Sequence, residues 1–189
     1  MDKGECSILP NSCTETTGAT TQPKLFYPNP NEGYIMRTWE DLKRVINEGR
    51  LHELGRREND QLEMTKHMTG VKAAYHSIKD YIDHRFFDFP VQDVIVNSNV
   101  KKVSTRPQEI SQKLVFRPND FPYNCEDSVS HYVLWCLKPL TFDEAKDYLD
   151  SYLGRQYGDD SNGYIFFVNP EHLQSIKEIF HYHVFIRNL

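Results

Sequence analysis

Aromatic side chains are concentrated toward the C-terminal end of this chain. Of its 24 Phe, Tyr and Trp residues, 15 lie from Phe116 onward, within the last 74 of 189 residues. In this part, residues 129–138 and 164–168 are apolar on both alternating faces, which is typical of buried strands. Residues 181–187 have the pattern of a third strand. The fold is therefore expected to centre on a small sheet built from these three runs.

Helical periodicity precedes this sheet. Thr38 is expected to cap a helix in which Trp39 begins an apolar stripe, and Gly49 is expected to end it. A longer helical region spans residues 59–83, with a break or kink expected at Gly70. After it, residues 91–96 are expected to form a short strand and residues 97–107 a polar loop.

Two further helices are expected between the strands. Thr141 and Glu144 form a capping box that opens the first, and Gly154 is expected to end it. Asn169 followed by Pro170 is typical of an N-cap and a first helical position, which predicts a short helix before the third strand.

The order of these elements predicts an α+β fold, in which an N-terminal helical layer packs on a small mixed C-terminal sheet. If the first two strands are parallel, their connection is expected to be a right-handed crossover. Residues 1–33 are low in complexity and predict a disordered tail, which leaves residues 34–189 as a single α+β domain.

Charge and cysteine content limit the expected setting of the protein. The net charge of −5 and the isoelectric point near 5.9 disfavour binding to nucleic acid or to an anionic membrane. No apolar run approaches the roughly 18 residues of a membrane span, and the first residues lack the pattern of a signal peptide. The four cysteines form no Cys-x-x-Cys pair. We therefore expect a cytoplasmic protein that binds neither nucleic acid nor a membrane, and its oligomeric state is not indicated.

Three histidines lie on the expected strands. Side chains two residues apart on a strand point to the same face, roughly 7 Å apart, so His181 and His183 share a face. Tyr182 and Val184 occupy the opposite face, which we expect to be the core. The histidine face is then expected to be the less buried one and to border a cleft.

Three interpretations of these histidines compete. His181 and His183 form a workable two-ligand clamp for a metal, with His131 or a remote acid as the third ligand. Alternatively, the imidazoles serve as general acids, bases or nucleophiles, because they titrate near neutral pH and can attack phosphorus. In the third interpretation they are structural and satisfy buried backbone groups or pack against aromatic rings.

The polar and aromatic residues near these histidines are candidates for substrate contact. Arg187 is a candidate partner for an anion such as phosphate. The alternative for the polar residues is a role in turns or helix caps. The full candidate set comprises Asn119, Asp120, Tyr123, Trp135, Gln174, Ser175 and Arg187 for binding, and His131, His181 and His183 for catalysis.

Several common functional motifs are absent from the sequence. There is no Gly-rich phosphate loop, no Gly-x-Ser-x-Gly elbow and no paired-carboxylate motif. The His-x-His pair is similar to part of the histidine-triad motif of nucleotide hydrolases, but Phe185 occupies the place of the third histidine. The residues therefore do not identify a cofactor.

The order of the motifs resembles a known family. The matching segments are the Arg-Pro-Asn-Asp-Phe-Pro-Tyr run at 117–123, the Ser-His-Tyr-Val-Leu-Trp run at 130–135, the Asn-Pro and Leu-Gln-Ser pieces within 169–175, and the strand at 181–187. Together they resemble the fungal family of uncharacterised proteins that includes the N-acetylglucosamine-induced protein. The resemblance covers residues 34–189 and implies a cytoplasmic fungal protein whose relatives are connected with the response to N-acetylglucosamine.

Two classes of function follow from these observations. One is a small enzyme that acts on an amino sugar, a sugar phosphate or a nucleotide sugar through a histidine pocket. The other is a non-catalytic binding or regulatory protein of amino-sugar metabolism. For either class, we expect His131 and at least one of His181 and His183 to line a common pocket, with Asn119, Asp120 or Tyr123 at its rim.

Overall fold

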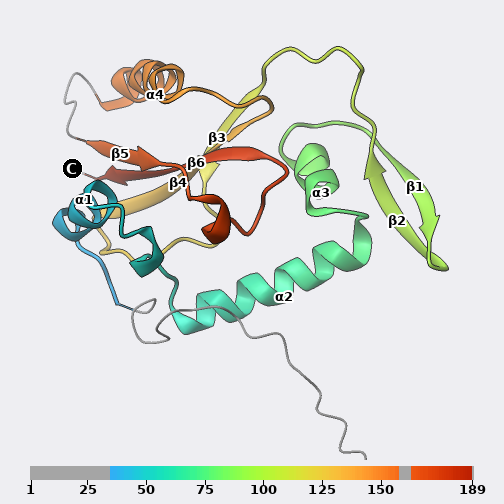
Figure 1. The fold of residues 1–189 in the computed structure, drawn as a ribbon, viewed down its shortest axis with the longest axis horizontal. Coiled ribbons are helices and arrows are strands. Elements are labelled where there is room, and N and C mark those ends of the chain that lie inside the picture. Colours follow the sequence, from blue (N-terminus) through green and yellow to red (C-terminus); the bar gives the residue numbers. More distant parts are fainter. Residues whose placement is uncertain (1–34, 158–162, 189) are drawn as a thin grey trace, which may run out of the picture.

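A four-stranded sheet forms the centre of the protein (Figure 1). The computed structural model describes residues 35–157 and 163–188, so the expected tail at 1–33 lies outside the described residues. The strands are β3 (Leu114–Pro118), β4 (Val129–Cys136), β5 (Tyr164–Phe167) and β6 (Phe180–Arg187), in the order β3-β4-β6-β5. The α+β class is confirmed.

The pairing within this sheet is antiparallel throughout, rather than mixed as expected. β4 and β5 run in the same direction and are connected through α4 (Phe142–Tyr157), but they are not neighbours. The last strand, β6, inserts between them and pairs antiparallel with both. The sheet therefore contains no adjacent parallel pair.

Helices cover both faces of the sheet, as Figure 1 shows for α4 on one side and α1 (Trp39–Asn47) on the other. The face that carries His131, His181 and His183, called the histidine face below, packs against α1 and α3 (Ile78–Arg85). The opposite face packs against α4. The expectation that the histidine face is the less buried one is wrong, because the three histidines are only 5–8% exposed beneath this helical cover.

Helix α1 begins where the sequence predicts. The Thr38 hydroxyl accepts a hydrogen bond from the backbone N–H of Asp41, and the Asp41 carboxylate accepts from the backbone N–H of Thr38. This reciprocal cap satisfies two N–H groups that the helix itself leaves unpaired.

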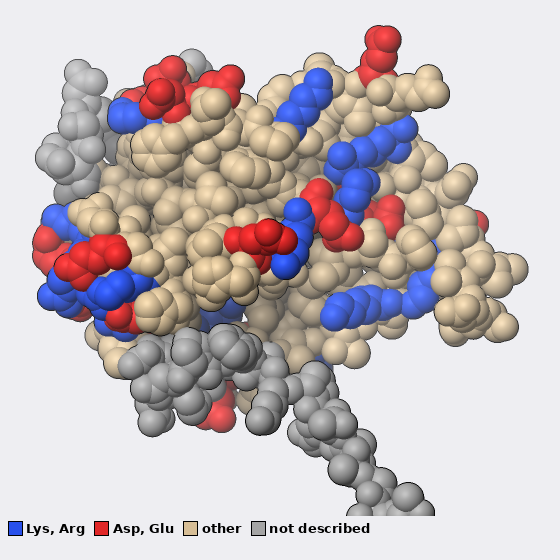
Figure 2. Space-filling model, viewed as in Figure 1, with Lys and Arg blue, Asp and Glu red and all other residues tan. Residues whose placement is uncertain are grey.

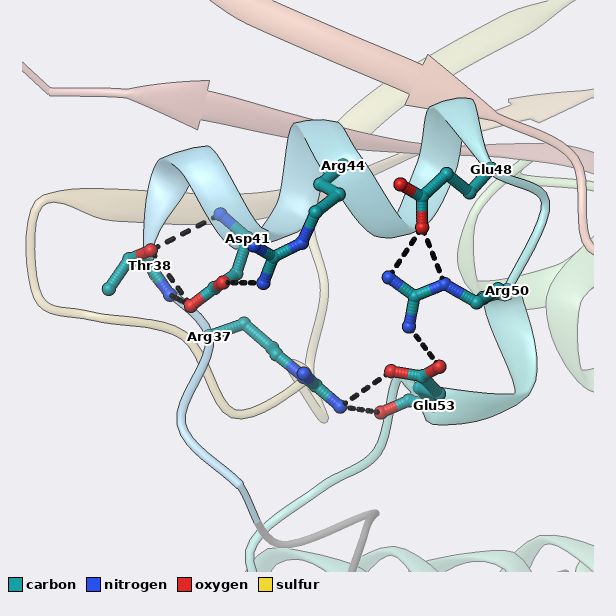
Figure 3. A network of polar contacts seen from close by, with 7 residues as sticks. All are labelled: Arg37, Thr38, Asp41, Arg44, Glu48, Arg50 and Glu53. Atoms are coloured by element: carbon teal, nitrogen blue, oxygen red, sulfur yellow. Dashed lines mark hydrogen bonds and ion pairs between the residues drawn. The ribbon is translucent and has the colours of Figure 1, made fainter.

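Charged side chains tie α1 to the short 3₁₀ turn η1 (Leu51–Glu53) that follows it (Figure 3). Arg37 donates to both the carboxylate and the backbone carbonyl of Glu53, at 3.2 and 3.3 Å, and Arg50 pairs with Glu48 and Glu53. Figure 2 shows acidic and basic side chains interspersed on this part of the surface. Isolated surface ion pairs contribute only about 0–1 kcal/mol each. The network therefore sets the position of η1 beside α1 and adds little to the overall stability.

The expected long helix is two helices, and its break is not at Gly70. α2 (Glu58–Ala74) runs through Gly70, and α3 begins after Ser77, whose hydroxyl caps it. Between them, Tyr75 forms a β-bridge with Lys102, and the His76 N–H donates to the Lys102 carbonyl at 3.0 Å. Pairing with a distant strand therefore ends α2, whereas an interior glycine costs a helix only about 1 kcal/mol.

A β-hairpin replaces the loop expected at 97–107. β1 (Val91–Val96) pairs with β2 (Asn99–Ser104), and Asn97 and Ser98 adopt positive φ angles of 50° and 64° at the turn. A two-residue turn with both central residues at positive φ matches the twist of a hairpin. Cross-strand pairing thus makes a strand of a segment that lacks apolar periodicity.

Two smaller expectations are also corrected. α4 continues through Gly154 to Tyr157 instead of ending there. Before β6, the expected short helix is a single 3₁₀ turn, η2 (Glu171–Leu173), and the side chain of Asn169 does not cap it. Within the described ranges, no helix is both long and apolar enough to cross a membrane.

Replacing Gly70 with alanine is expected to raise the free energy of unfolding by about 0.5–1 kcal/mol. Gly70 is an exposed interior residue of α2, and a Cβ built there meets no atom within 4 Å. Urea denaturation followed by circular dichroism measures the change. Gly49→Ala is the matched control with the opposite sign, because Gly49 has a φ of +69° that a Cβ disfavours. A loss of stability in Gly70→Ala would contradict the prediction.

Candidate functional site

A cavity of about 390 Å³ lies on the histidine face of the sheet. Its walls come from η1, the start of α2, α3, the loop at 117–123 and the segment at 169–176. Eight of the ten candidate residues line it, namely Asn119, Asp120, Tyr123, Trp135, Gln174, Ser175, His181 and His183. Their roles in binding or catalysis remain predictions.

The other two candidates lie outside the lining. His131 contacts the lining residue His183, with their ring centroids 5.2 Å apart, but it does not itself line the cavity as expected. Arg187 lies at the exposed end of β6, away from the cavity. It is therefore not placed to hold an anion beside the histidines.

His131 and His183 are joined in a directed chain of hydrogen bonds. The backbone N–H of Tyr123 donates to Nδ1 of His131 at 3.0 Å, so this nitrogen carries no proton. In a neutral ring Nε2 must then be protonated, and it donates to Nδ1 of His183 at 3.0 Å. By the same rule, the proton of His183 lies on Nε2.

Asn169 receives the end of this chain. Its side-chain amide lies 3.0 Å from Nε2 of His183 and 3.1 Å from the hydroxyl of Tyr123. The structure places the amide nitrogen at both contacts, but because Nε2 of His183 is a donor, we assign the amide the reverse orientation, in which its oxygen accepts from Nε2 and from the Tyr123 hydroxyl. Gln174 supports this residue by donating to the backbone carbonyl of Asn169 at 2.6 Å. Asn169 is not among the site residues predicted from the sequence, because Asn before Pro is equally typical of a helix cap.

The chain of hydrogen bonds keeps both rings neutral and uses all four of their ring nitrogens. Burial lowers the pKa of His131 and of His183 well below the ordinary value, and the positive charge of Arg56 adds to the effect in both. Asn119 lies 3.4 Å from each ring nitrogen of His131, so it does not select between tautomers. The His131–His183 pair therefore acts as a rigid support and has no free nitrogen for a ligand.

His181 differs from this pair because one of its nitrogens is free. Nδ1 lies 2.8 Å from the backbone carbonyl of Ile179 and must donate to it, which leaves Nε2 as an unprotonated acceptor. Within residues 35–157 and 163–188, Nε2 of His181 has no hydrogen-bond partner. It is also not fully buried, because in these ranges the only fully buried side-chain nitrogen or oxygen without a hydrogen bond is Nε of Arg37. Nε2 of His181 therefore remains accessible from the cavity.

The surroundings of His181 favour a neutral base. Burial lowers its pKa below the ordinary value, and the hydrogen bond to Ile179 partly opposes this effect. The indole ring of Trp135 lies against the imidazole, with their centroids 4.8 Å apart. At neutral pH the ring is therefore unprotonated at Nε2 and able to accept a proton.

A metal site is not favoured by this geometry. Nδ1 of His131 and both nitrogens of His183 take part in hydrogen bonds within the protein, so they do not converge on a common point with His181. In the described part of the chain, no three His, Cys, Asp or Glu side chains are grouped closely enough to hold a metal ion.

Two arginines contribute positive charge to the cavity, and neither was among the sequence candidates. Arg117 stacks over the ring of Phe86, with its guanidinium carbon 4.2 Å from the centroid, and pairs with Asp120 at 2.8 Å. Arg56 precedes α2 and reaches the cavity from a separate part of the chain. The sequence signal for Arg56 is a basic pair directly before a helix, which is too common to single it out.

Comparison with known proteins places this fold and site in a family. The family model described as "Protein of unknown function (DUF3605)" matches residues 38–187. This chain belongs to the DUF3605 family. The match includes every candidate site residue, and it ends at Arg187, the last residue of β6.

One sequence relative and one solved structure of similar fold extend the comparison for this DUF3605 protein. The uncharacterized protein YPL067C of Saccharomyces cerevisiae (strain ATCC 204508 / S288c) is 29% identical over 160 residues, which cover 78% of this chain and 77% of the yeast protein. A solved structure titled "Crystal Structure of HTC1" has a similar fold, with a TM-score of 0.53, 24% identity, and coverage of 79% of this chain and 84% of that chain. The family model and the yeast protein agree with the expected family of uncharacterised fungal-type proteins, whereas the solved structure supports the fold alone. None of the three descriptions mentions N-acetylglucosamine.

Proposed function

We propose that this DUF3605 protein is a small cytoplasmic enzyme that acts on an amino sugar, a sugar phosphate or a nucleotide sugar. The observation that carries the proposal is the free, unprotonated Nε2 of His181 on the wall of a partly open cavity. Cavities of about 300–1,000 Å³ with a few polar groups among apolar walls are typical of small-molecule sites. The resemblance to the N-acetylglucosamine-induced protein puts amino sugars and their derivatives first among the ligands to test.

The chemical role of His181 follows from its hydrogen bonds. Nε2 accepts a proton from a hydroxyl group of the substrate or from a water molecule, so that an O–H bond breaks and an N–H bond forms. The resulting imidazolium keeps its bond from Nδ1 to the Ile179 carbonyl, and the adjacent Trp135 ring stabilises its charge. The His131–His183 pair holds the neighbouring wall in position and takes no part in the proton transfer.

A ligand screen followed by a product assay tests the proposal. Amino sugars, their phosphates, nucleotide sugars and divalent metals are added separately to the full chain, and melting temperatures are measured. A ligand at 100 times its Kd stabilises the native state by about 2.7 kcal/mol, so a binding compound should raise the melting temperature by several degrees. Compounds that bind are then incubated with the protein, and NMR detects their conversion.

His181→Asn separates catalysis from binding. The asparagine amide preserves a donor near the position of Nδ1 but has no basic nitrogen, so turnover should fall by about 10²- to 10⁴-fold while binding is retained. His76→Gln is the matched control, because His76 is exposed and lies outside the cavity lining. If wild-type protein binds a compound without converting it, the alternative of a non-catalytic binding or regulatory protein is favoured. If no compound raises the melting temperature, both small-molecule functions are contradicted.

A further inference from the structure

The position of Arg56 is set by two contacts within the protein. Its Nε donates to the backbone carbonyl of Phe121 at 2.7 Å. Its guanidinium carbon lies 5.0 Å from the centroid of the Tyr123 ring, within the range of a cation–π interaction. The Tyr123 ring is in turn stacked on His183, with a centroid separation of 5.4 Å and an interplanar angle of 21°. Arg56 therefore belongs to the same packed unit as the histidine pair.

The charge of Arg56 is not balanced by the residues around the cavity. Asp120 is the only carboxylate that the described residues contribute to the lining, and it pairs with Arg117. Among the residues described, the two terminal nitrogens of Arg56 have no hydrogen-bond or ion-pair partner. A half-buried cation without a counter-charge is unfavourable, and an anionic oxygen group on a ligand offsets this cost.

We propose that Arg56 binds a phosphoryl group of the ligand, and this inference rests on the proposed small-molecule function of the cavity. The two free terminal nitrogens of its guanidinium match two oxygens of one phosphate, which is the bidentate geometry that arginine provides and lysine does not. The substrate class is therefore phosphorylated sugars rather than uncharged amino sugars.

The size of the cavity narrows this class. Its volume of about 390 Å³ lies toward the lower end of the range for small-molecule sites, about 300–1,000 Å³. A monosaccharide phosphate is small enough to lie between Arg56 and the His181–Trp135 wall. A nucleotide sugar adds a base and a ribose, which would extend beyond a cavity of this volume.

Isothermal titration calorimetry with three probes tests the inference, namely N-acetylglucosamine, its 6-phosphate and inorganic phosphate. Wild-type protein is expected to bind the sugar phosphate most tightly. Arg56→Gln should weaken that binding by about tenfold to hundredfold, which is the usual effect of losing hydrogen bonds to a charged group. Arg56→Lys should restore only part of the affinity, because lysine keeps the positive charge but lacks the paired N–H donors that bind two phosphate oxygens. Arg44→Gln, on the exposed side of α1, should bind like the wild type.

Other outcomes would overturn the assignment of Arg56 as the phosphate site without contradicting the proposed enzyme function. Equal binding of the free sugar and the sugar phosphate, or unchanged affinity in a folded Arg56→Gln variant, would exclude Arg56 as the anion site. A loss of affinity in Arg187→Gln instead would locate the anion at the end of β6. In each case the cavity still binds a sugar, and the His181→Asn assay still tests its chemistry. Melting curves of Arg56→Gln and Arg56→Lys establish that both variants are folded.

Discussion

Lowering the pH from 7 to 5 is expected to reduce the free energy of unfolding by about 4 kcal/mol, mainly through His131 and His183. Both rings are neutral and buried in the native state, so burial holds their pKa values well below the ordinary value of 6.5. In the unfolded chain they take up protons below about pH 6.5. The unfolded state therefore binds more protons than the native state, and stability falls as the pH falls.

The size of this effect follows from linkage. Each histidine that stays neutral in the native state contributes about 2 kcal/mol between pH 7 and pH 5, given an unfolded pKa of 6.5. The pair thus removes a large part of the roughly 5–15 kcal/mol typical of a folded domain. The stabilisation is fully present above pH 6.5 and is lost progressively below it. His181, whose pKa is also lowered by burial, acts in the same direction.

Urea denaturation at half-unit pH steps measures the effect. Between pH 7 and pH 5 the change in stability reports on the histidines and not on buried carboxylates such as Asp83. The pKa of Asp83 is below the ordinary value of 3.8, so this carboxylate stays ionised over the whole interval. The slope of the free energy of unfolding against pH is proportional to the number of protons taken up on unfolding. His183→Gln should reduce this number by about one. His76→Gln, at an exposed position, should leave the slope close to that of the wild type. A stability that does not change over this interval would show that the native pair carries protons, contrary to the hydrogen-bond chain.

Replacing Asp83 with asparagine is expected to lower the free energy of unfolding by about 3–5 kcal/mol, the usual cost of removing one partner from a buried ion pair. Asp83 lies in α3 and is fully buried. Its carboxylate accepts from Nε of Arg106 at 2.7 Å, from Lys79 at 2.6 Å and from the Ser104 hydroxyl at 2.8 Å. An asparagine amide cannot accept all of these bonds, and two cations would then share an uncharged partner.

The hydrogen bonds also explain the ionisation of Asp83. Burial on its own raises the pKa of the carboxyl, but the bonds from Arg106, Lys79 and Ser104 lower it by more, so the group stays ionised at neutral pH. Because Ser104 ends β2, the loss of the carboxylate should also loosen the hairpin against α3. Hydrogen exchange of the β1 and β2 amides should therefore accelerate in Asp83→Asn.

The matched control for Asp83→Asn is Asp93→Asn. Asp93 lies on β1, its side chain is 62% exposed, and it pairs with Lys102 at 3.4 Å. Removing a surface pair of this kind should change stability by less than about 1 kcal/mol. If Asp83→Asn is no more destabilising than Asp93→Asn, the carboxylate does not anchor the hairpin to α3.

Local patterns in the sequence predicted most of the elements that form the layers. The Thr38 and Thr141 capping boxes mark the starts of α1 and α4, because a helix start depends on bonds between neighbouring residues. The apolar runs of β4, β5 and β6 were recognisable for a similar reason, since alternation along one strand reflects burial on each face. The His-x-His spacing also placed His181 and His183 on one face, where they are found.

The errors concern features that depend on distant residues. β2 forms because it pairs with β1, and α2 ends where Tyr75 pairs with Lys102 rather than at Gly70. The antiparallel sheet order depends on β6 inserting between β4 and β5. None of these pairings leaves a periodic signal in the paired segment itself.

The sequence by itself therefore determined the α+β class, the strands that carry the histidines, and the residue types available for chemistry. Only the tertiary structure decided the function of each ring, because the β4–β6 register sets which nitrogens meet. That register joins His131 to His183 and leaves Nε2 of His181 free. Asn169 and Arg56 join the site from separate segments of the chain. A hydrogen bond between residues far apart in the chain depends on how the elements pack, and no local spacing encodes that packing.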